Sequence, residues 1–180
     1  FVGFHSDDLG LNRSCRACAN GAGGNMTDVR IRRASARDAD TVAALFLETR
    51  RHSMAYLPVI RTVDETRRWM AETIFCDFDV WVAERGPEIA AFLALAGRHV
   101  EYLYVRPSHQ RLGIGDMLLT KAKRLSPEGL ELLVFAENTP AQAFYRARGF
   151  HCVAELVIPE EEGSGYQFVW TPEGAPNKAR

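Results

Sequence analysis

The stretch that decides the fold runs from Glu101 to Gly115 and reads EYLYVRPSHQRLGIG. Its apolar run from Tyr102 to Val105 predicts a strand, and Pro107 then ends the hydrogen-bond ladder. After a short polar turn, the glycine loop leads into a helical pattern that begins near Asp116. A strand that enters a helix through such a loop gathers free backbone N–H groups at the positive end of the helix dipole. The stretch therefore predicts a site for a phosphate or pyrophosphate.

Two familiar phosphate loops do not fit this stretch. A dinucleotide-binding fingerprint needs a third glycine three residues after Gly115, where this chain has Leu118. A nucleoside-triphosphate loop needs Lys and then Ser or Thr after the last glycine, whereas Asp116 and Met117 follow here. A plain turn that caps a helix remains as an alternative at this point.

The bulk composition limits the class of protein. The chain has 180 residues, 47% of them hydrophobic, and a formal net charge of -1, which indicates one globular domain and predicts neither a nucleic acid nor an anionic membrane as partner. No apolar run approaches the ~20 residues of a membrane span, so we expect a soluble protein, and the use of its four cysteines predicts a reducing cytoplasm. Cys15 and Cys18 form one C-x-x-C without a second ligand pair, so no metal is expected. Cys76 and Cys152 are expected to be core thiols.

Two segments of different character predict the domain organisation. Residues 1–25 are rich in Gly, Asn, Ser and Ala without sustained periodicity, which predicts a flexible extension outside the core. A regular pattern begins after Met26, so residues 26–180 are expected to form a single domain.

The order of the predicted elements gives the fold class. Capping-box pairs, Ser35 with Asp38 and Thr62 with Glu65, predict the starts of two helices after a first strand. The helix opened by Pro140 is expected to end at Gly149. The pattern predicts an α/β (α+β) domain with a mixed sheet and helices on both faces. The expected strands are 28–33, 80–84, 89–96, 99–105, 130–136, 153–158 and 166–170, with 130–136 parallel to 99–105.

Two blocks of the sequence resemble one known family. The block from Gln110 to Gly115 looks like the Gln/Arg-x-x-Gly-x-Gly/Ala signature of the GNAT superfamily of acyl-CoA N-acyltransferases. The block from Asn138 to Phe150 is similar to that superfamily's second recurring motif. The resemblance implies a centrally splayed sheet of about seven strands and transfer of an acetyl group from acetyl-CoA to a primary amine.

The resemblance also implies where acetyl-CoA binds. The loop backbone would hold the pyrophosphate, the strand before it would pair with the pantetheine arm, and Asn138 would contact that arm; Asn138 could equally cap the helix at Pro140. The implied cofactor residues are Leu103, Tyr104, Val105, Gln110, Arg111, Leu112, Gly113, Ile114, Gly115, Asp116, Asn138, Ala141, Phe144 and Tyr145.

Catalysis requires groups that move protons. Tyr145 matches the family's tyrosine near the cofactor sulfur, although it could also be a core aromatic residue, and the N–H of Val105 would stabilise the oxyanion. Strand periodicity places His99 and Glu101 on the same face as Val105, and burial would raise the pKa of Glu101. Either residue could be the base, directly or through water. A water chain without a strict base and a solvent-exposed Glu101 are the alternatives.

The acceptor is less defined by the sequence. Acceptor specificity in the family usually comes from the segments that correspond here to 52–61 and 159–166. These segments predict Tyr56, Arg61, Glu160 and Glu161 as substrate-binding residues, and Glu101 on the strand 99–105 is a further candidate as a substrate anchor. The acidic run favours a cationic small molecule, such as an aminoglycoside or polyamine, and a peptide or protein N-terminus or an amino acid is the alternative. A CoA-binding module without catalysis is the alternative of another class. A monomer or a homodimer is expected.

Overall fold

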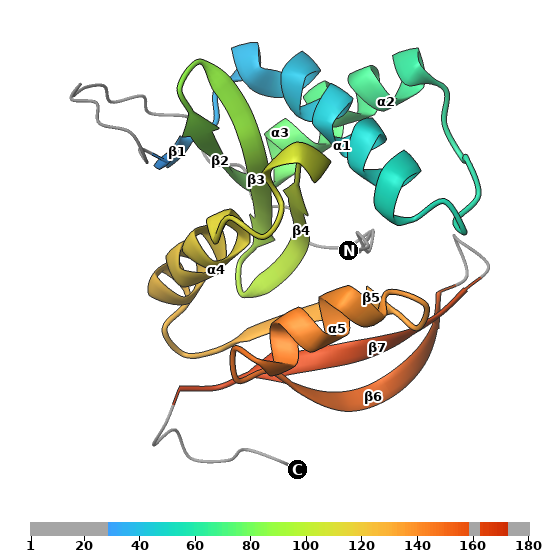
Figure 1. The fold of residues 1–180 in the computed structure, drawn as a ribbon, viewed down its shortest axis with the longest axis vertical. Coiled ribbons are helices and arrows are strands. Elements are labelled where there is room, and N and C mark those ends of the chain that lie inside the picture. Colours follow the sequence, from blue (N-terminus) through green and yellow to red (C-terminus); the bar gives the residue numbers. More distant parts are fainter. Residues whose placement is uncertain (1–28, 159–162, 173–180) are drawn as a thin grey trace.

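The computed structural model describes residues 29–158 and 163–172 (Figure 1). The predicted N-terminal extension and the residues Glu160 and Glu161 lie outside this range. The strands are β1 (Val29–Arg33), β2 (Asp79–Arg85), β3 (Glu88–Ala96), β4 (His99–Val105), β5 (Leu130–Phe135), β6 (His151–Ile158) and β7 (Gly163–Trp170). The helices are α1 (Ala39–Ser53), α2 (Val63–Trp69), α3 (Phe75–Asp77), α4 (Ile114–Leu125) and α5 (Thr139–Arg146), with short helical turns η1 (Ala36–Asp38), η2 (Met70–Ile74, a π-helix) and η3 (Pro107–His109).

The sheet consists of two antiparallel parts joined at one point. Its strand order is β1-β2-β3-β4-β5-β7-β6, and only β4 and β5 are parallel neighbours. Their pairing is limited to His99 opposite Glu131, after which the strands diverge, as Figure 1 shows. The predicted mixed, splayed, seven-stranded sheet is therefore confirmed.

Helices cover both faces of the sheet, as the sequence predicted. On one face, α1 and η2 bury Leu45, Phe46 and Ile74 against β3 and β4. On the other face, α4 and α5 bury Leu118 and Tyr145 in a second cluster. Burial of apolar surface stabilises a fold by about 25 cal/mol per Å². The packing of these helices therefore holds the strands beneath them in place.

Both predicted capping boxes are present. The Ser35 backbone N–H donates to the Asp38 carboxylate at 2.7 Å, and the Thr62 N–H donates to Glu65 at 2.7 Å. Asp38 also accepts two hydrogen bonds from Arg32 at 2.7 and 2.9 Å, which connects β1 to the start of α1. These local contacts explain why both helix starts could be predicted from the sequence.

The predicted alternation along β4 is wrong in its first half. The register with β3 shifts because Tyr102 pairs with Ala94 while Val100 pairs with Leu95, which leaves Glu101 as the extra residue of a β-bulge. Val100 consequently packs in the same cluster as Leu103, and His99 does not continue the face of Val105.

Three smaller expectations are also corrected. Cys76 and Cys152 are exposed rather than buried, since Cys76 lies in the short α3 and Cys152 lies on the edge strand β6. Gly165 belongs to β7 rather than to a loop. The helix opened by Thr62 was expected to run through Ile74, and the structure extends it to Asp77, because the π-helical turn η2 connects α2 to α3.

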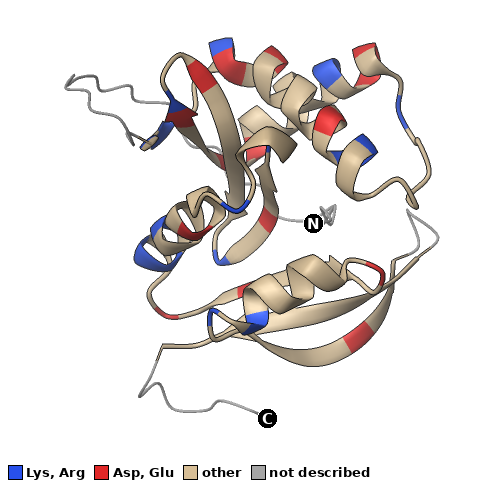
Figure 2. Cartoon of the chain, in the orientation of Figure 1, with Lys and Arg blue, Asp and Glu red and all other residues tan. Residues whose placement is uncertain are grey.

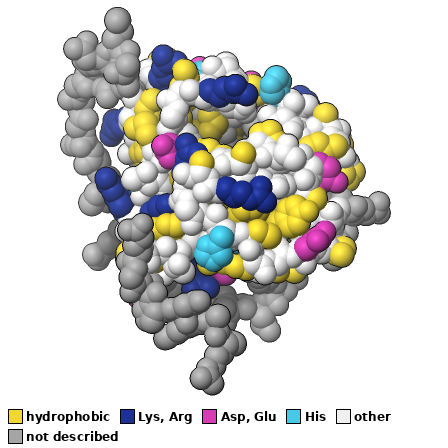
Figure 3. All heavy atoms as spheres, turned by 60° about the horizontal axis from the view of Figure 1, so that its bottom comes forward, with side chains coloured by type: hydrophobic (Ala, Val, Ile, Leu, Met, Phe, Trp, Pro, Cys, Tyr) yellow, Lys and Arg dark blue, Asp and Glu magenta, His cyan; other side chains and the backbone are white. Residues whose placement is uncertain are grey.

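The surface near β6 exposes apolar side chains. Val153 and Val157 of this edge strand are 51% and 75% exposed. Figure 3, with the β6 end of the molecule turned forward, shows apolar side chains beside scattered charged ones.

In the described part of the chain, no helix is long and apolar enough to cross a bilayer.

The carboxylate of Asp38 provides a test of how β1 is attached to α1. Hydrogen bonds from Arg32, and secondarily from Ser35, lower the pKa of Asp38 from 3.8 to about 2. Because the folded-state pKa is depressed, the stabilisation is present above pH 3.8 and disappears as the pH falls through about 2. Asp38→Asn should lower the free energy of unfolding at pH 7 by about 1–2 kcal/mol, measured by urea denaturation, and should flatten its acid dependence. Asp40→Asn, a matched change in the first turn of α1, should cost less than about 0.5 kcal/mol; equal losses in both variants would contradict this assignment.

Candidate functional site

The loop between β4 and α4 has the backbone geometry of an anion-binding turn. Arg111 and Gly113 have left-handed φ angles of 61° and 79°, and Gly113 is the N-terminal cap of α4. The first N–H groups of a helix have no carbonyl partner within it, and the helix dipole makes this end positive. The loop therefore suits the phosphate groups predicted from the sequence.

Gly115 brings the two sequence blocks together. A Cβ atom at this position would lie 3.4 Å from the Phe144 ring and 3.5 Å from the Val105 side chain. Asp116 accepts a 2.6 Å hydrogen bond from Arg148, whose guanidinium lies 3.8 Å from the centre of the Phe144 ring. The start of α4 is thus held against α5 and the end of β4.

The far side of the loop is fastened by groups that the sequence did not reveal. Arg106 forms ion pairs with Glu48 of α1 and, at 2.9 Å, with Glu88 of β3. The side-chain amide of Gln110 donates to the Val105 carbonyl at 3.1 Å, so it holds the loop to β4. The partners of Arg106 lie far away in the sequence, and no local pattern could have identified them.

Tyr145 is fully buried between the two sequence blocks. Its ring makes edge contacts with Phe144 and Phe150 at centroid distances of 5.1 and 5.4 Å. Burial, with a smaller effect of the neighbouring Tyr104, raises the pKa of Tyr145 well above its ordinary value. The phenol therefore stays protonated across the physiological pH range and can donate a hydrogen bond.

His99 and Glu101 lie where β4 begins to separate from β5. Glu101 is 4% exposed, and one of its carboxylate oxygens is 3.9 Å from Nε2 of His99. Burial lowers the pKa of His99, and the charge of Glu131 opposes this shift only in part. The structure thus places a carboxylate and a mostly neutral imidazole together, although they do not share a strand face.

Asn138 caps α5, which is the alternative role that the sequence analysis gave it. Its side-chain oxygen accepts a 3.2 Å hydrogen bond from the Ala141 N–H, and the residue is 8% exposed. This contact uses the amide oxygen and leaves the amide nitrogen as the group that could bind a carbonyl of a ligand.

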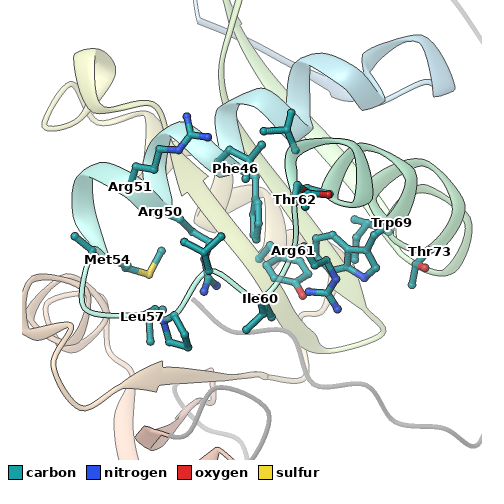
Figure 4. A pocket seen from close by; sticks show the side chains of 18 of the residues that line it. Phe46, Arg50, Arg51, Met54, Leu57, Ile60, Arg61, Thr62, Trp69 and Thr73 are labelled. Carbon is teal, nitrogen blue, oxygen red and sulfur yellow. The ribbon is translucent and has the colours of Figure 1, made fainter.

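A cavity of about 970 Å³ lies beside β4, between α1, the segment that follows it and α2 (Figure 4). Arg61 lines it, and its guanidinium lies 4.6 Å from the centre of the Trp69 ring. Tyr102 of β4 contributes to the wall. Tyr56 instead makes an edge contact with Phe135 of β5 at 6.3 Å, and neither Tyr56 nor Glu101 is among the described lining residues. Figure 4 shows other side chains of the wall, among them Phe46, Arg50, Met54, Leu57, Ile60, Thr62 and Thr73.

Comparison with known proteins agrees with this arrangement. The acetyltransferase (GNAT) domain model matches residues 76–152. The peptidyl-lysine N-acetyltransferase YjaB of Salmonella typhimurium is 34% identical over 102 residues, which cover 50% of this chain and 70% of that protein. The probable N-acetyltransferase Rv2775 of Mycobacterium tuberculosis is 26% identical over 170 residues, covering 84% and 90%. The solution structure of apo YjaB from Escherichia coli superposes with a TM-score of 0.67 at 20% identity and covers 79% of this chain and 97% of that one.

The fold and these relatives define the class. The chain belongs to the GNAT family of acetyltransferases. It is an acyl-CoA-dependent N-acetyltransferase, and acetyl-CoA is the acetyl donor of this class. Within the described residues, no group of three or more His, Cys, Asp or Glu side chains is placed to hold a metal ion.

Gly113 provides a test of the loop. Gly113→Ala would force a side chain into a left-handed conformation, at a cost of about 1 kcal/mol, and should weaken CoA binding about tenfold by distorting the N–H cradle. Titration calorimetry with CoA would measure this loss. Gly86→Ala is the matched control, because Gly86 also has a left-handed φ of 60° and open space around it but lies in the β2–β3 turn. Equal CoA affinity in both variants would rule out the loop as the phosphate site.

Proposed function

We propose that the chain moves the acetyl group of acetyl-CoA to a primary amine by direct attack within a ternary complex. The observation that carries the proposal is the divergence of β4 from β5 after one residue pair, directly before an anion-binding loop. Acetyl-CoA supplies an activated thioester. The amine nitrogen bonds to the acetyl carbon, the bond from that carbon to sulfur breaks, the amine loses a proton, and the sulfur leaves with its electron pair.

The residues present fit this donor. The N–H groups from Arg111 to Asp116 would hold the pyrophosphate, with Arg111 adding charge. The backbone of Leu103, Tyr104 and Val105 would pair with the pantetheine arm, and a backbone N–H, most simply that of Val105, would donate to the acetyl oxygen. The amide nitrogen of Asn138 would donate to the arm. Ala141 and Phe144 of α5 would line its other side, and Gln110 would keep the loop attached to β4.

Tyr145 would assist the departing sulfur. A thiol has an ordinary pKa of about 8.5, so a phenol with a raised pKa is the weaker acid and does not transfer its proton completely. Tyr145 would therefore act mainly as a hydrogen-bond donor to the developing thiolate. Because burial excludes water, that single bond stabilises charge more strongly than it would in solvent.

Glu101 and His99 are the candidates for accepting the amine proton. Glu101 combines burial with a position where β4 leaves β5, and His99, with Nε2 3.9 Å from that carboxylate, is the second candidate at the same place. A water molecule between the amine and this pair would serve if the amine does not reach the carboxylate.

The acceptor would bind in the cavity beside Tyr102, whose volume suits a small-molecule amine. The expectation of a polycationic acceptor, such as an aminoglycoside or polyamine, depended on Glu160 and Glu161, for which the described residues give no information. The described cavity wall instead contributes arginines. The relatives named for peptidyl-lysine acetylation support a lysine side chain as the alternative acceptor.

We further propose that the enzyme works as a monomer or homodimer in a reducing cytoplasm. The two cysteines of the described region, Cys76 and Cys152, are free and exposed, which suits such a compartment. Size-exclusion chromatography with light scattering would determine the oligomeric state.

Tyr145→Phe tests the role of the phenol. The substitution keeps the ring packing, so kcat should fall at least tenfold while the Kd of CoA changes less than about threefold. Fixed-time assays of free thiol release would give kcat, and titration calorimetry would give the Kd of CoA. Tyr166→Phe, a change at a partly buried tyrosine of β7, is the control, and an unchanged kcat in Tyr145→Phe would remove the proposed role.

Glu101→Gln tests the assignment of the base. If Glu101 accepts the proton, the rate at pH 7 should fall at least tenfold, and the acidic limb of the kcat/KM profile should flatten. His99→Gln is the companion variant: because the pKa of His99 is lowered, its acidic limb would lie below pH 6.5. A limb that persists in Glu101→Gln and vanishes in His99→Gln would transfer the role to the histidine.

A further inference from the structure

Arg61 has a constrained position in the cavity wall. Its guanidinium lies over the Trp69 ring, and the residue is half-buried. Figure 4 shows Arg61 and Trp69 side by side on one side of the cavity. Of the ion pairs formed between described residues, none includes Arg61. The charge of Glu65 in the first turn of α2 acts on Arg61 from beyond ion-pair distance. A guanidinium that is held flat and forms no direct ion pair with the described chain can bind an anion from a ligand.

The charge of the surrounding wall has the same sign. Arg51 also lines the cavity, whereas the described lining residues include no aspartate or glutamate. Figure 2 shows the corresponding basic segments at the carboxyl end of α1 and before α2. A second positive ligand group would be repelled here, and a carboxylate would be attracted.

The aromatic side chains of the cavity could suggest the opposite preference. The ring centres of Phe46 and Tyr102 lie 5.5 and 5.8 Å from that of Trp69. Aromatic clusters of this kind can bind ammonium groups through their ring faces. Arg61 already covers one face of Trp69, and Arg50 lies 5.6 Å from the centre of the Phe46 ring. Since the protein's own cations use these faces, the rings offer an apolar surface for the ligand body.

We propose that the acceptor is a small primary amine that carries a carboxylate on an apolar body, and that Arg61 binds this carboxylate. Phe46, Trp69 and Tyr102 contact the apolar body. Tyr102 is the residue that β4 contributes to the cavity wall and Arg61 directly precedes α2, so the amine end would point toward β4 and the carboxylate toward the start of α2. The inference rests on the proposed function and names the substrate class of the same site.

A matched set of amines tests the charge preference. The acceptors 5-aminopentanoate, pentylamine and 1,5-diaminopentane carry a carboxylate, a methyl group or an ammonium at similar distances from the reacting amine. A second series, with the same three end groups on a benzylamine, offers an aromatic body. Release of free CoA should give kcat/KM values about tenfold or more higher for the carboxylate than for the neutral amine, with the diamine lowest. Pentanoate, which has no amine, should inhibit competitively against the amine acceptor.

Two arginine variants separate binding from folding. Arg61→Gln should lower the carboxylate-to-neutral ratio of kcat/KM about tenfold and raise the inhibition constant of pentanoate by a similar factor. Arg68→Gln, an equal change of charge at an exposed position of α2 that does not line this cavity, should leave both quantities within about twofold. Melting curves of both variants would show whether they fold.

The outcomes distinguish the two proposals. If the diamine is the best acceptor, or if Arg61→Gln leaves the ratio and the inhibition unchanged, the carboxylate inference is overturned while the acetyltransferase function stands. The carboxylate inference would also be overturned if a lysine peptide is acetylated faster than every small amine, at a rate that does not depend on whether acidic or basic residues flank the lysine. If no amine or peptide releases CoA at all, the proposed function itself fails.

Discussion

The site depends on the separation of β4 from β5. Two neighbouring parallel strands would normally satisfy each other's backbone groups along their full length, but here the pairing is confined to His99 and Glu131. Beyond that pair, the facing edges of two buried strands need partners. An extended ligand arm with amide groups can supply them in the manner of an added strand. The same separation that would weaken an ordinary sheet therefore creates the place where we propose that the donor binds.

The separation is stable because other contacts hold each half of the sheet. On one side, Arg106 links the end of β4 to α1 and β3. On the other, β7 pairs along the whole of β5, and Arg148 ties α5 to the first turn of α4. The helices pack across both faces of the sheet and bury its apolar side chains in two clusters. The gap can therefore remain between two rigid parts, which would keep the proposed catalytic residues Tyr145 and Glu101 in position before the substrates arrive.

Sequence patterns predicted the features whose causes are local. The capping boxes, the glycine loop and the helix stop at Gly149 each involve residues within a few positions of one another. The resemblance implied a bulge in this strand, but its position at Glu101 was not predicted, because it arises from the register of β4 against β3, which the alternation of one strand does not contain. The contacts of Arg106 and the exposure of Cys152 were also missed, since both depend on which elements become neighbours and which strand forms the edge.

The proposed donor and acceptor halves of the site also differ in whether local sequence or tertiary packing defines them. The donor half is built from two continuous blocks, the loop before α4 and the start of α5, and a recurring motif is sufficient to recognise it. The acceptor half takes Phe46 from α1, Arg61 from the following segment, Trp69 from α2 and Tyr102 from β4. Each of these residues would be unremarkable in its own segment, and only packing of the helices against the sheet makes them one surface. The proposed acceptor site is therefore a product of tertiary structure, whereas the proposed donor site is encoded in local sequence.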